Sequence, residues 1–266
     1  MRRISLAAFD IDGTLFDERK KTFPASAICA LKKLNERKIS IALVTGRPPA
    51  SASLIESFGV GIDAYVCCNG HMVIHQQNVL YDERFTSVLA EEVWKYCQEH
   101  DIGLMWKYPD KTIVYKDDEE FQKIFAKNSK YRSNRFNIIY DRQDYHWIEA
   151  ANNGVLACSI EELEEFNRVF DKRCVAIDIN GKSSDLMLYG VSKQSGFEKL
   201  LKQLNLLPEE CIAFGDNNND LEMLKYAGIG VCMGNGSAKL KEMADYVAAD
   251  IADDGIYKAL EHFELI

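Results

Sequence analysis

Short, almost unbroken apolar runs that alternate with helical patterns constrain the fold of this 266-residue chain most strongly. Near the N-terminus, such runs cover Ile4 to Phe9, Ile39 to Val44 and Asp63 to Cys68. Runs without polar alternation are typical of strands buried on both faces of a parallel sheet. Apolar residues at helical spacing separate them, and Pro24 and Pro48 suit first helical turns. This order predicts a doubly wound sheet.

The same alternation of predicted strands and helices occurs near the C-terminus. Strands are predicted at Cys211 to Phe214, Ile229 to Cys232 and Tyr246 to Val247. The predicted helices are Lys193 to Leu204, Leu221 to Tyr226, Ala238 to Met243 and Ile256 to Phe263. We therefore expect residues 1–82 and 188–266 to form one Rossmann-like α/β core with a parallel sheet.

Between these two parts, residues 83–187 show a different pattern. Hairpins are predicted for Leu104 to Tyr108 with Ile113 to Lys116, and for Val175 to Ile179 with Leu186 to Tyr189. The predicted helices are Val88 to Cys97, Glu119 to Phe125 and Glu161 to Phe170. Hairpins and separate helices inside an alternating chain predict an inserted α/β domain.

The composition restricts the class of partner. A formal net charge of -9 argues against nucleic acid, whose phosphates attract clustered Lys and Arg. No apolar run reaches the ~18 residues of a membrane span, and the N-terminus lacks the pattern of a signal peptide. The eight cysteines include no Cys-x-x-Cys pair, which is typical of buried thiols in a reducing compartment. We expect a cytoplasmic protein.

Two acidic residues, Asp10 and Asp12, directly follow the first predicted strand. In an extended backbone, residues i and i+2 point to the same side, so both carboxylates face one space and repel unless a cation lies between them. Gly13 allows the chain to turn sharply close to a ligand. The alternative is a turn made of common turn residues. A calcium loop is excluded because no Asp or Asn lies two residues after Asp12.

A second acidic segment, Asp216-Asn217-Asn218-Asn219-Asp220, also follows a predicted strand and opens a helix. Because the carboxyl ends of parallel strands share one edge of a sheet, this segment can meet Asp10 although about 200 residues separate them. Three carboxylates and an amide form a hard-oxygen site suited to Mg²⁺ and a substrate phosphate. Taken alone, the segment would also suit a polar helix cap.

Two further positions are suited to binding an anion. Thr45 ends a predicted strand, and Gly46 leads into the start of a helix, so a hydroxyl and backbone N–H groups are available together. Lys193 lies in the first turn of a predicted helix, where the helix dipole disfavours a cation. Its position is better explained if an anion lies nearby. The alternatives are an ordinary strand-to-helix turn and a solvated lysine.

Four segments resemble, in order and spacing, the four motifs of the haloacid dehalogenase-like hydrolase superfamily. They are Asp10-Ile11-Asp12-Gly13-Thr14, Val44-Thr45-Gly46-Arg47, Lys193 and Gly215-Asp216-Asn217-Asn218-Asn219-Asp220. The insertion resembles the type IIB cap of the Cof-type phosphatase branch, and Cys68-Asn69-Gly70 also fits that branch. The chain departs from the pattern at Asn217-Asn218-Asn219, where the family more often has an acidic residue. This departure concerns the fine-tuning of the metal site.

The resemblance implies a phosphoryl transfer in two steps. Asp10 attacks phosphorus and forms an aspartyl-phosphate. Asp12 protonates the leaving oxygen and then deprotonates the hydrolytic water. The Asp10 carboxylate, the Asp12 backbone carbonyl and Asp216 bind Mg²⁺.

The resemblance also implies groups that hold the phosphate and groups that support them. The phosphate-binding residues are Thr45, Gly46, Lys193 and Asn219. The supporting residues are Arg47, Asn69, Gly70 and Asp220. Among these, Asp220 orients either Lys193 or a metal-bound water.

The expected function is hydrolysis of small phosphorylated metabolites, such as sugar phosphates or phosphorylated cofactors. A phosphotransferase or phosphomutase would use the same aspartyl-phosphate, and the sequence leaves this alternative open. A non-enzymatic phospho-aspartate switch is disfavoured because Asp12 favours rapid hydrolysis. The sequence leaves the natural substrate open, and also whether the chain is a monomer or a homodimer.

Overall fold

The computed structural model describes residues 3–116, 137–140, 142–179 and 181–266. The helix predicted over Glu119 to Phe125 lies outside these residues. The chain divides into two compact units. The first unit comprises Met1–Gly46, Ala52–Tyr81 and Ser192–Ile266, and the second comprises Arg47–Ser51 and Asp82–Val191.

The first unit contains an eight-stranded sheet of order β14-β13-β12-β1-β2-β3-β4-β5. Its strands are β1 (Leu6–Phe9), β2 (Ser40–Val44), β3 (Ala64–Cys67), β4 (Met72–His75), β5 (Asn78–Asp82), β12 (Cys211–Gly215), β13 (Ile229–Cys232) and β14 (Tyr246–Val247). The six strands from β14 to β3 pair in parallel, and β4 pairs antiparallel to β3. The predicted doubly wound parallel core is confirmed.

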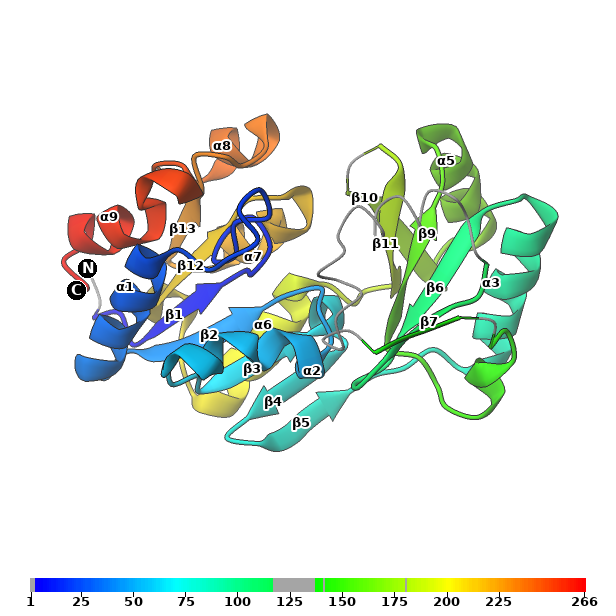
Figure 1. The fold of residues 1–266 in the computed structure, drawn as a ribbon, viewed down its shortest axis with the longest axis horizontal. Helices are drawn as coiled ribbons and strands as arrows, with labels where there is room; N and C mark the ends of the chain where they lie inside the picture. Colours follow the sequence, from blue (N-terminus) through cyan, green and yellow to red (C-terminus); the bar gives the residue numbers. More distant parts are fainter. Residues whose placement is uncertain (1–2, 117–136, 141, 180) are drawn as a thin grey trace. The chain divides into compact units, whose positions relative to one another are not determined.

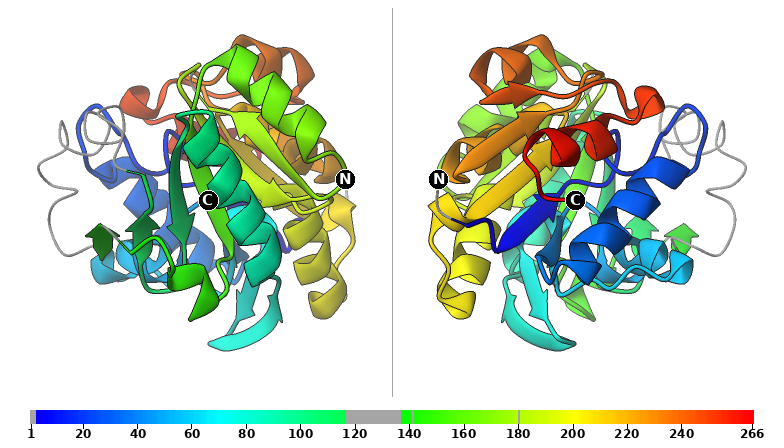
Figure 2. Two further views of the ribbon diagram at one scale, coloured as in Figure 1. Left: turned by 90° about the vertical axis from the view of Figure 1, so that its right-hand side faces the viewer. Right: turned by 90° about the vertical axis from the view of Figure 1, so that its left-hand side faces the viewer.

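Helices cover both faces of this sheet (Figure 1). They are α1 (Ala25–Glu36), α6 (Lys193–Leu204), α7 (Leu221–Tyr226), α8 (Ala238–Met243) and α9 (Gly255–His262), while the short α2 (Pro49–Ala52) follows β2. Along β1, Ala7 and Phe9 join the apolar core that contains α1 and α9, whereas Leu6 and Ala8 join the core that contains α6 and α7. This alternation explains why the β1 sequence is apolar throughout. Figure 2 shows α1 and α9 on one side of the sheet and α6 on the other.

The second unit contains a six-stranded sheet of order β10-β11-β9-β6-β7-β8. Its strands are β6 (Gly103–Lys107), β7 (Thr112–Val114), β8 (Ile138–Tyr140), β9 (Asn153–Ala157), β10 (Cys174–Asp178) and β11 (Ser183–Leu188). The helices α3 (Ser87–Glu99) and α5 (Ile160–Val169) share an apolar core with this sheet. Both predicted hairpins, β6–β7 and β10–β11, are confirmed as antiparallel pairs. Within the described ranges, no helix is long and apolar enough to cross a membrane.

Candidate active site

Asp10 lies at the carboxyl edge of the first unit's sheet. β1 pairs with β2 on one side and with β12 on the other, so Phe9 lies opposite Phe214. The Asp10 backbone N–H donates to the Phe214 carbonyl oxygen at 2.9 Å, which extends this pairing by one residue. Asp10 is only 4% exposed. The sheet therefore fixes the backbone of Asp10 next to the segment that follows β12.

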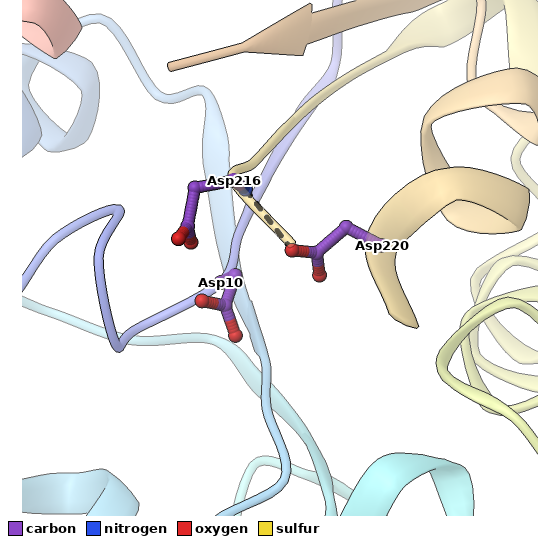
Figure 3. A group of neighbouring side chains, drawn as sticks. All are labelled: Asp10, Asp216 and Asp220. Carbon is purple, nitrogen blue, oxygen red and sulfur yellow. Dashed lines mark hydrogen bonds between the residues drawn. The ribbon is translucent and has the colours of Figure 1, made fainter. Parts of the chain in front are cut away.

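Three carboxylates meet at this edge, as Figure 3 shows. Asp10 comes from the end of β1, Asp216 follows β12, and Asp220 ends a short 3₁₀ turn (Asn218–Asp220). One oxygen atom of each carboxylate lies within 4.8 Å of the others. The sequence predicted this convergence from the common edge of parallel strands.

Lys193 lies between two of these carboxylates. Its Nζ atom donates to Asp10 Oδ1 at 2.7 Å and to Asp220 Oδ1 at 2.6 Å. Its side chain is 2% exposed, and Ser192 caps the helix α6 that it begins. A buried ammonium at a helix N-terminus needs such anionic partners, because both burial and the helix dipole disfavour its charge.

The pKa values in this cluster follow from burial and charge. Burial raises the pKa of Asp10 well above its usual range, and the negative charges of Asp220, Asp216 and Asp12 add to this rise, while Lys193 opposes it. Burial disfavours the charged form of Lys193, but Asp10 and Asp220 outweigh it and raise the pKa of the ammonium. Lys193 therefore stays protonated across the physiological pH range.

Asp220 uses both of its carboxylate oxygens within the protein. Oδ1 accepts from Lys193, and Oδ2 accepts from the backbone N–H groups of Asp216 and Asn217, each at 3.0 Å. These bonds hold the turn after β12 and aim Lys193 at Asp10. Asp10 and Asp216 are therefore better placed than Asp220 to offer oxygen atoms to a cation.

The loop after Asp10 packs closely against Asp216. Gly13 has a φ of +83°, and a Cβ atom there would lie 2.2 Å from Asp216 Oδ2. The Thr14 hydroxyl donates to Asp216 Oδ1 at 2.9 Å. Only glycine fits this position, since any side chain would meet the carboxylate and the left-handed backbone would be strained. Asp12 is half-buried in this loop.

Sequence reasoning missed the contact that Asn235 makes with this loop. Its Nδ2 group donates to the Gly13 carbonyl oxygen at 2.7 Å, and its Oδ1 atom accepts from the Ile251 backbone N–H at 3.0 Å. The feature of the sequence that could have indicated this contact is the asparagine of Met233-Gly234-Asn235, which lies just after the apolar strand β13. Because that turn reaches back to the first motif, it holds the Gly13 backbone in place.

The remaining predicted phosphate-binding residues lie together in the first unit. Thr45 is buried at the end of β2, and its carbonyl oxygen accepts from the Asn69 backbone N–H at 3.0 Å. A Cβ atom on Gly46 would lie 3.1 Å from Asn69 Oδ1, and Asn219 Nδ2 donates to that same oxygen at 3.3 Å. Arg47, by contrast, is grouped with the second unit, where its Nη1 atom lies 3.5 Å from the Ser51 carbonyl oxygen.

The donor set fits a hard divalent cation. Asp10 and Asp216 supply carboxylate oxygens, which Mg²⁺ prefers over nitrogen or sulfur. Burial, followed by the charge of Asp220, raises the pKa of Asp216 to about 7. A cation held by Asp10 and Asp216 would offset both the burial and the mutual repulsion that raise these pKa values.

The raised pKa of Asp216 predicts a pH dependence of stability. In the metal-free protein, the folded state holds a proton on Asp216 up to a pH of about 7, whereas the unfolded state loses it near 3.8. Stability should therefore fall as the pH rises from 5 to 8. Melting temperatures in EDTA across this range measure the slope. Asp216→Asn should reduce the slope, and an equal slope in this variant would contradict the assignment.

Comparisons with known proteins identify the family of this chain. The profile of the haloacid dehalogenase-like hydrolase family matches residues 7–260. The chain is 27% identical to the 5-amino-6-(5-phospho-D-ribitylamino)uracil phosphatase YitU of Bacillus subtilis, over 98% of each chain. It is also 27% identical to the HMP-PP phosphatase of Serratia proteamaculans, over 90% of this chain and 86% of that protein.

A solved structure resembles the whole chain. It is described as a sugar phosphatase of haloacid dehalogenase subclass IIB, with a TM-score of 0.87, 27% identity and coverage of 98% of this chain and 100% of that one. The four sequence motifs, the parallel core and the family profile thus agree. The chain belongs to the haloacid dehalogenase-like hydrolase family, as its motifs predict, and is a phosphatase of the Cof-type branch.

Proposed function

We propose that this protein hydrolyses small phosphorylated metabolites in a Mg²⁺-dependent reaction that passes through an aspartyl-phosphate on Asp10. The observation that carries the proposal is the buried Lys193, which bridges Asp10 and Asp220 beside Asp216. Lys193 draws charge toward one oxygen of Asp10, and the second oxygen remains for attack on phosphorus. The Lys193 ammonium thereby fixes the orientation of the Asp10 carboxylate.

The metal would be held by the Asp10 carboxylate, the Asp12 backbone carbonyl and Asp216. When bound, Mg²⁺ supplies positive charge between an anionic nucleophile and an anionic ester, whose repulsion is otherwise about 4 kcal/mol per charge pair at ~4 Å and an effective dielectric constant of ~20. Thr14 orients Asp216 through its hydrogen bond. The close approach of Gly13 brings the loop backbone to the same carboxylate.

The protein's own groups move the protons and hold the phosphoryl oxygens. As the bond between Asp10 and phosphorus forms, the ester P–O bond breaks, and Asp12 gives its proton to the leaving oxygen. Asp12 then takes a proton from the water that hydrolyses the aspartyl-phosphate. The groups that bind the phosphoryl oxygens are the Thr45 hydroxyl, the Gly46 N–H, Lys193 and Asn219.

Residues 83–187 act, in this proposal, as the inserted cap domain that selects the substrate. The relatives named above suggest the substrate class, because they are a sugar phosphatase, a 5-amino-6-(5-phospho-D-ribitylamino)uracil phosphatase and an HMP-PP phosphatase. We therefore propose sugar phosphates or phosphorylated cofactors as substrates. A screen of phosphorylated metabolites with the purified protein would identify the natural one.

The metal requirement gives a direct test. Release of phosphate from p-nitrophenyl phosphate should fall by at least ~100-fold in EDTA and return with Mg²⁺, because charge repulsion blocks the attack without the cation. Mass spectrometry of acid-quenched protein should find a phosphoryl group on the peptide that contains Asp10. Equal turnover in EDTA would contradict the metal requirement, and transfer to an added alcohol instead of water would indicate a phosphotransferase.

A further inference from the structure

The turn that follows β3 holds a buried residue in an unusual conformation. Asn69 has φ and ψ angles of 55° and 36°, in the left-handed region, and is fully buried. Among residues other than glycine, asparagine tolerates this region best. Strained residues of this kind persist where the surrounding structure fixes them, often at functional sites. Here the Asn69 backbone N–H is tied to the Thr45 carbonyl oxygen at the end of β2.

The Asn69 side chain contacts Asn219 and lies beside Gly46. Its Oδ1 atom accepts from Asn219 Nδ2 at 3.3 Å, which restricts the plane of the Asn219 amide. Its own Nδ2 atom is buried and has no hydrogen-bond partner. Since an unpaired buried donor destabilises the fold, stability alone does not explain an asparagine here.

The next residue, Gly70, joins the same turn to the start of α6. A Cβ atom on Gly70, whose φ is +98°, would lie 1.9 Å from the Ser192 carbonyl oxygen. A Cβ atom on Gly196 would lie 2.7 Å from Gly70 Cα. The backbone of the turn therefore packs directly on the first turn of the helix that begins with Lys193.

We infer that Asn69 is a positioning residue for phosphoryl transfer, and this inference rests on the proposed function. The Asn69-Gly70 turn touches three segments that bind phosphate in that proposal: the end of β2, the start of α6 and the turn that carries Asn219. The Asn69 side chain acts through Asn219, whose amide it holds in one orientation. A correctly oriented amide binds the phosphoryl oxygens more strongly in the transition state than in the ground state.

Asn69→Gly tests this role, because glycine keeps the left-handed backbone and removes only the side chain. We expect kcat to fall by about 10-fold with KM changed by less than about twofold, the pattern for an interaction made in the transition state. Inhibition by orthovanadate, which resembles the transition state, should weaken more than inhibition by inorganic phosphate. The melting temperature should stay close to that of the wild type, because the substitution removes the unpaired buried Nδ2 donor together with the bond that Oδ1 accepts from Asn219.

Asn205→Gly is the matched control. Asn205 is also left-handed, with a φ of 53°, but it is exposed and ends α6. This variant should keep the kinetic constants of the wild type. If Asn69→Gly and Asn205→Gly behave alike, Asn69 has no positioning role.

A double-mutant cycle separates positioning from an independent effect. If Asn69 acts through Asn219, the variant that carries both Asn69→Gly and Asn219→Ala should be no slower than Asn219→Ala alone. Additive losses would overturn the inference. These outcomes are distinct from failure of the proposed function, which would appear as normal turnover in Asp10→Asn.

Discussion

Asp10→Asn is expected to lower kcat for phosphate release on the order of 10⁴-fold, because an amide cannot serve as the anionic nucleophile. Asn keeps the size of the side chain, and Lys193 keeps its bond to Asp220. The substitution also removes one of several carboxylates that repel one another. We therefore expect a melting temperature equal to or above that of the wild type. Steady-state kinetics with Mg²⁺ and a thermal scan measure both effects.

The matched control for this variant is Asp63→Asn. Asp63 Oδ2 accepts from the Ile41 backbone N–H at 2.8 Å, and an asparagine oxygen can replace that bond. The control should keep activity close to that of the wild type, which would show that amide substitution of a carboxylate in this unit is tolerated. Normal turnover in Asp10→Asn would show that Asp10 is not the nucleophile.

The strands that carry the site were predictable because they are buried on both faces. β1, β2 and β12 therefore have apolar sequences that differ clearly from the surrounding turns. The hairpin of β4 and β5 was missed because β5 is mostly exposed and its turn uses Gln76 and Gln77 instead of the usual Asn-Gly. β9 was missed because it begins with Asn153-Gly154, a pair typical of turns, although all its residues are buried.

The composition of the site was more predictable than its hydrogen bonds. The rule that parallel strands share a carboxyl edge was sufficient to bring Asp10, Asp216 and Asp220 together. It could not show that both carboxylate oxygens of Asp220 accept hydrogen bonds within the protein. It also could not show that the Thr14 hydroxyl donates to Asp216, which lies 202 positions away in the sequence. Such contacts depend on side-chain rotamers and loop paths, which periodicity does not specify.

Lys193→Met should lower both activity and stability, because the substitution leaves Asp10 and Asp220 buried together without their cation. Removing one partner of a buried ion pair destabilises by about 3–5 kcal/mol. We also expect kcat to fall by about 10³-fold, since the nucleophile and the phosphoryl oxygens both lose a positive charge. Chemical denaturation in EDTA at pH 8 and steady-state kinetics with Mg²⁺ measure the two losses.

The stability loss in Lys193→Met should depend on pH in a defined direction. Lys193 lowers the pKa of Asp10, so without it that pKa rises further above its unfolded value. A carboxyl group whose folded pKa is raised favours folding at low pH and loses that contribution as the pH rises. The deficit relative to wild type should therefore be largest at pH 8 and shrink toward pH 5. Lys202→Met is the control, because Lys202 lies exposed on the same helix and pairs with Glu198 at 2.7 Å, an interaction that solvent screens and that contributes little to stability. A pH-independent deficit would mean that Lys193 stabilises the fold through packing. Equal stability of Lys193→Met and Lys202→Met would show that the buried ion pair does not stabilise the fold.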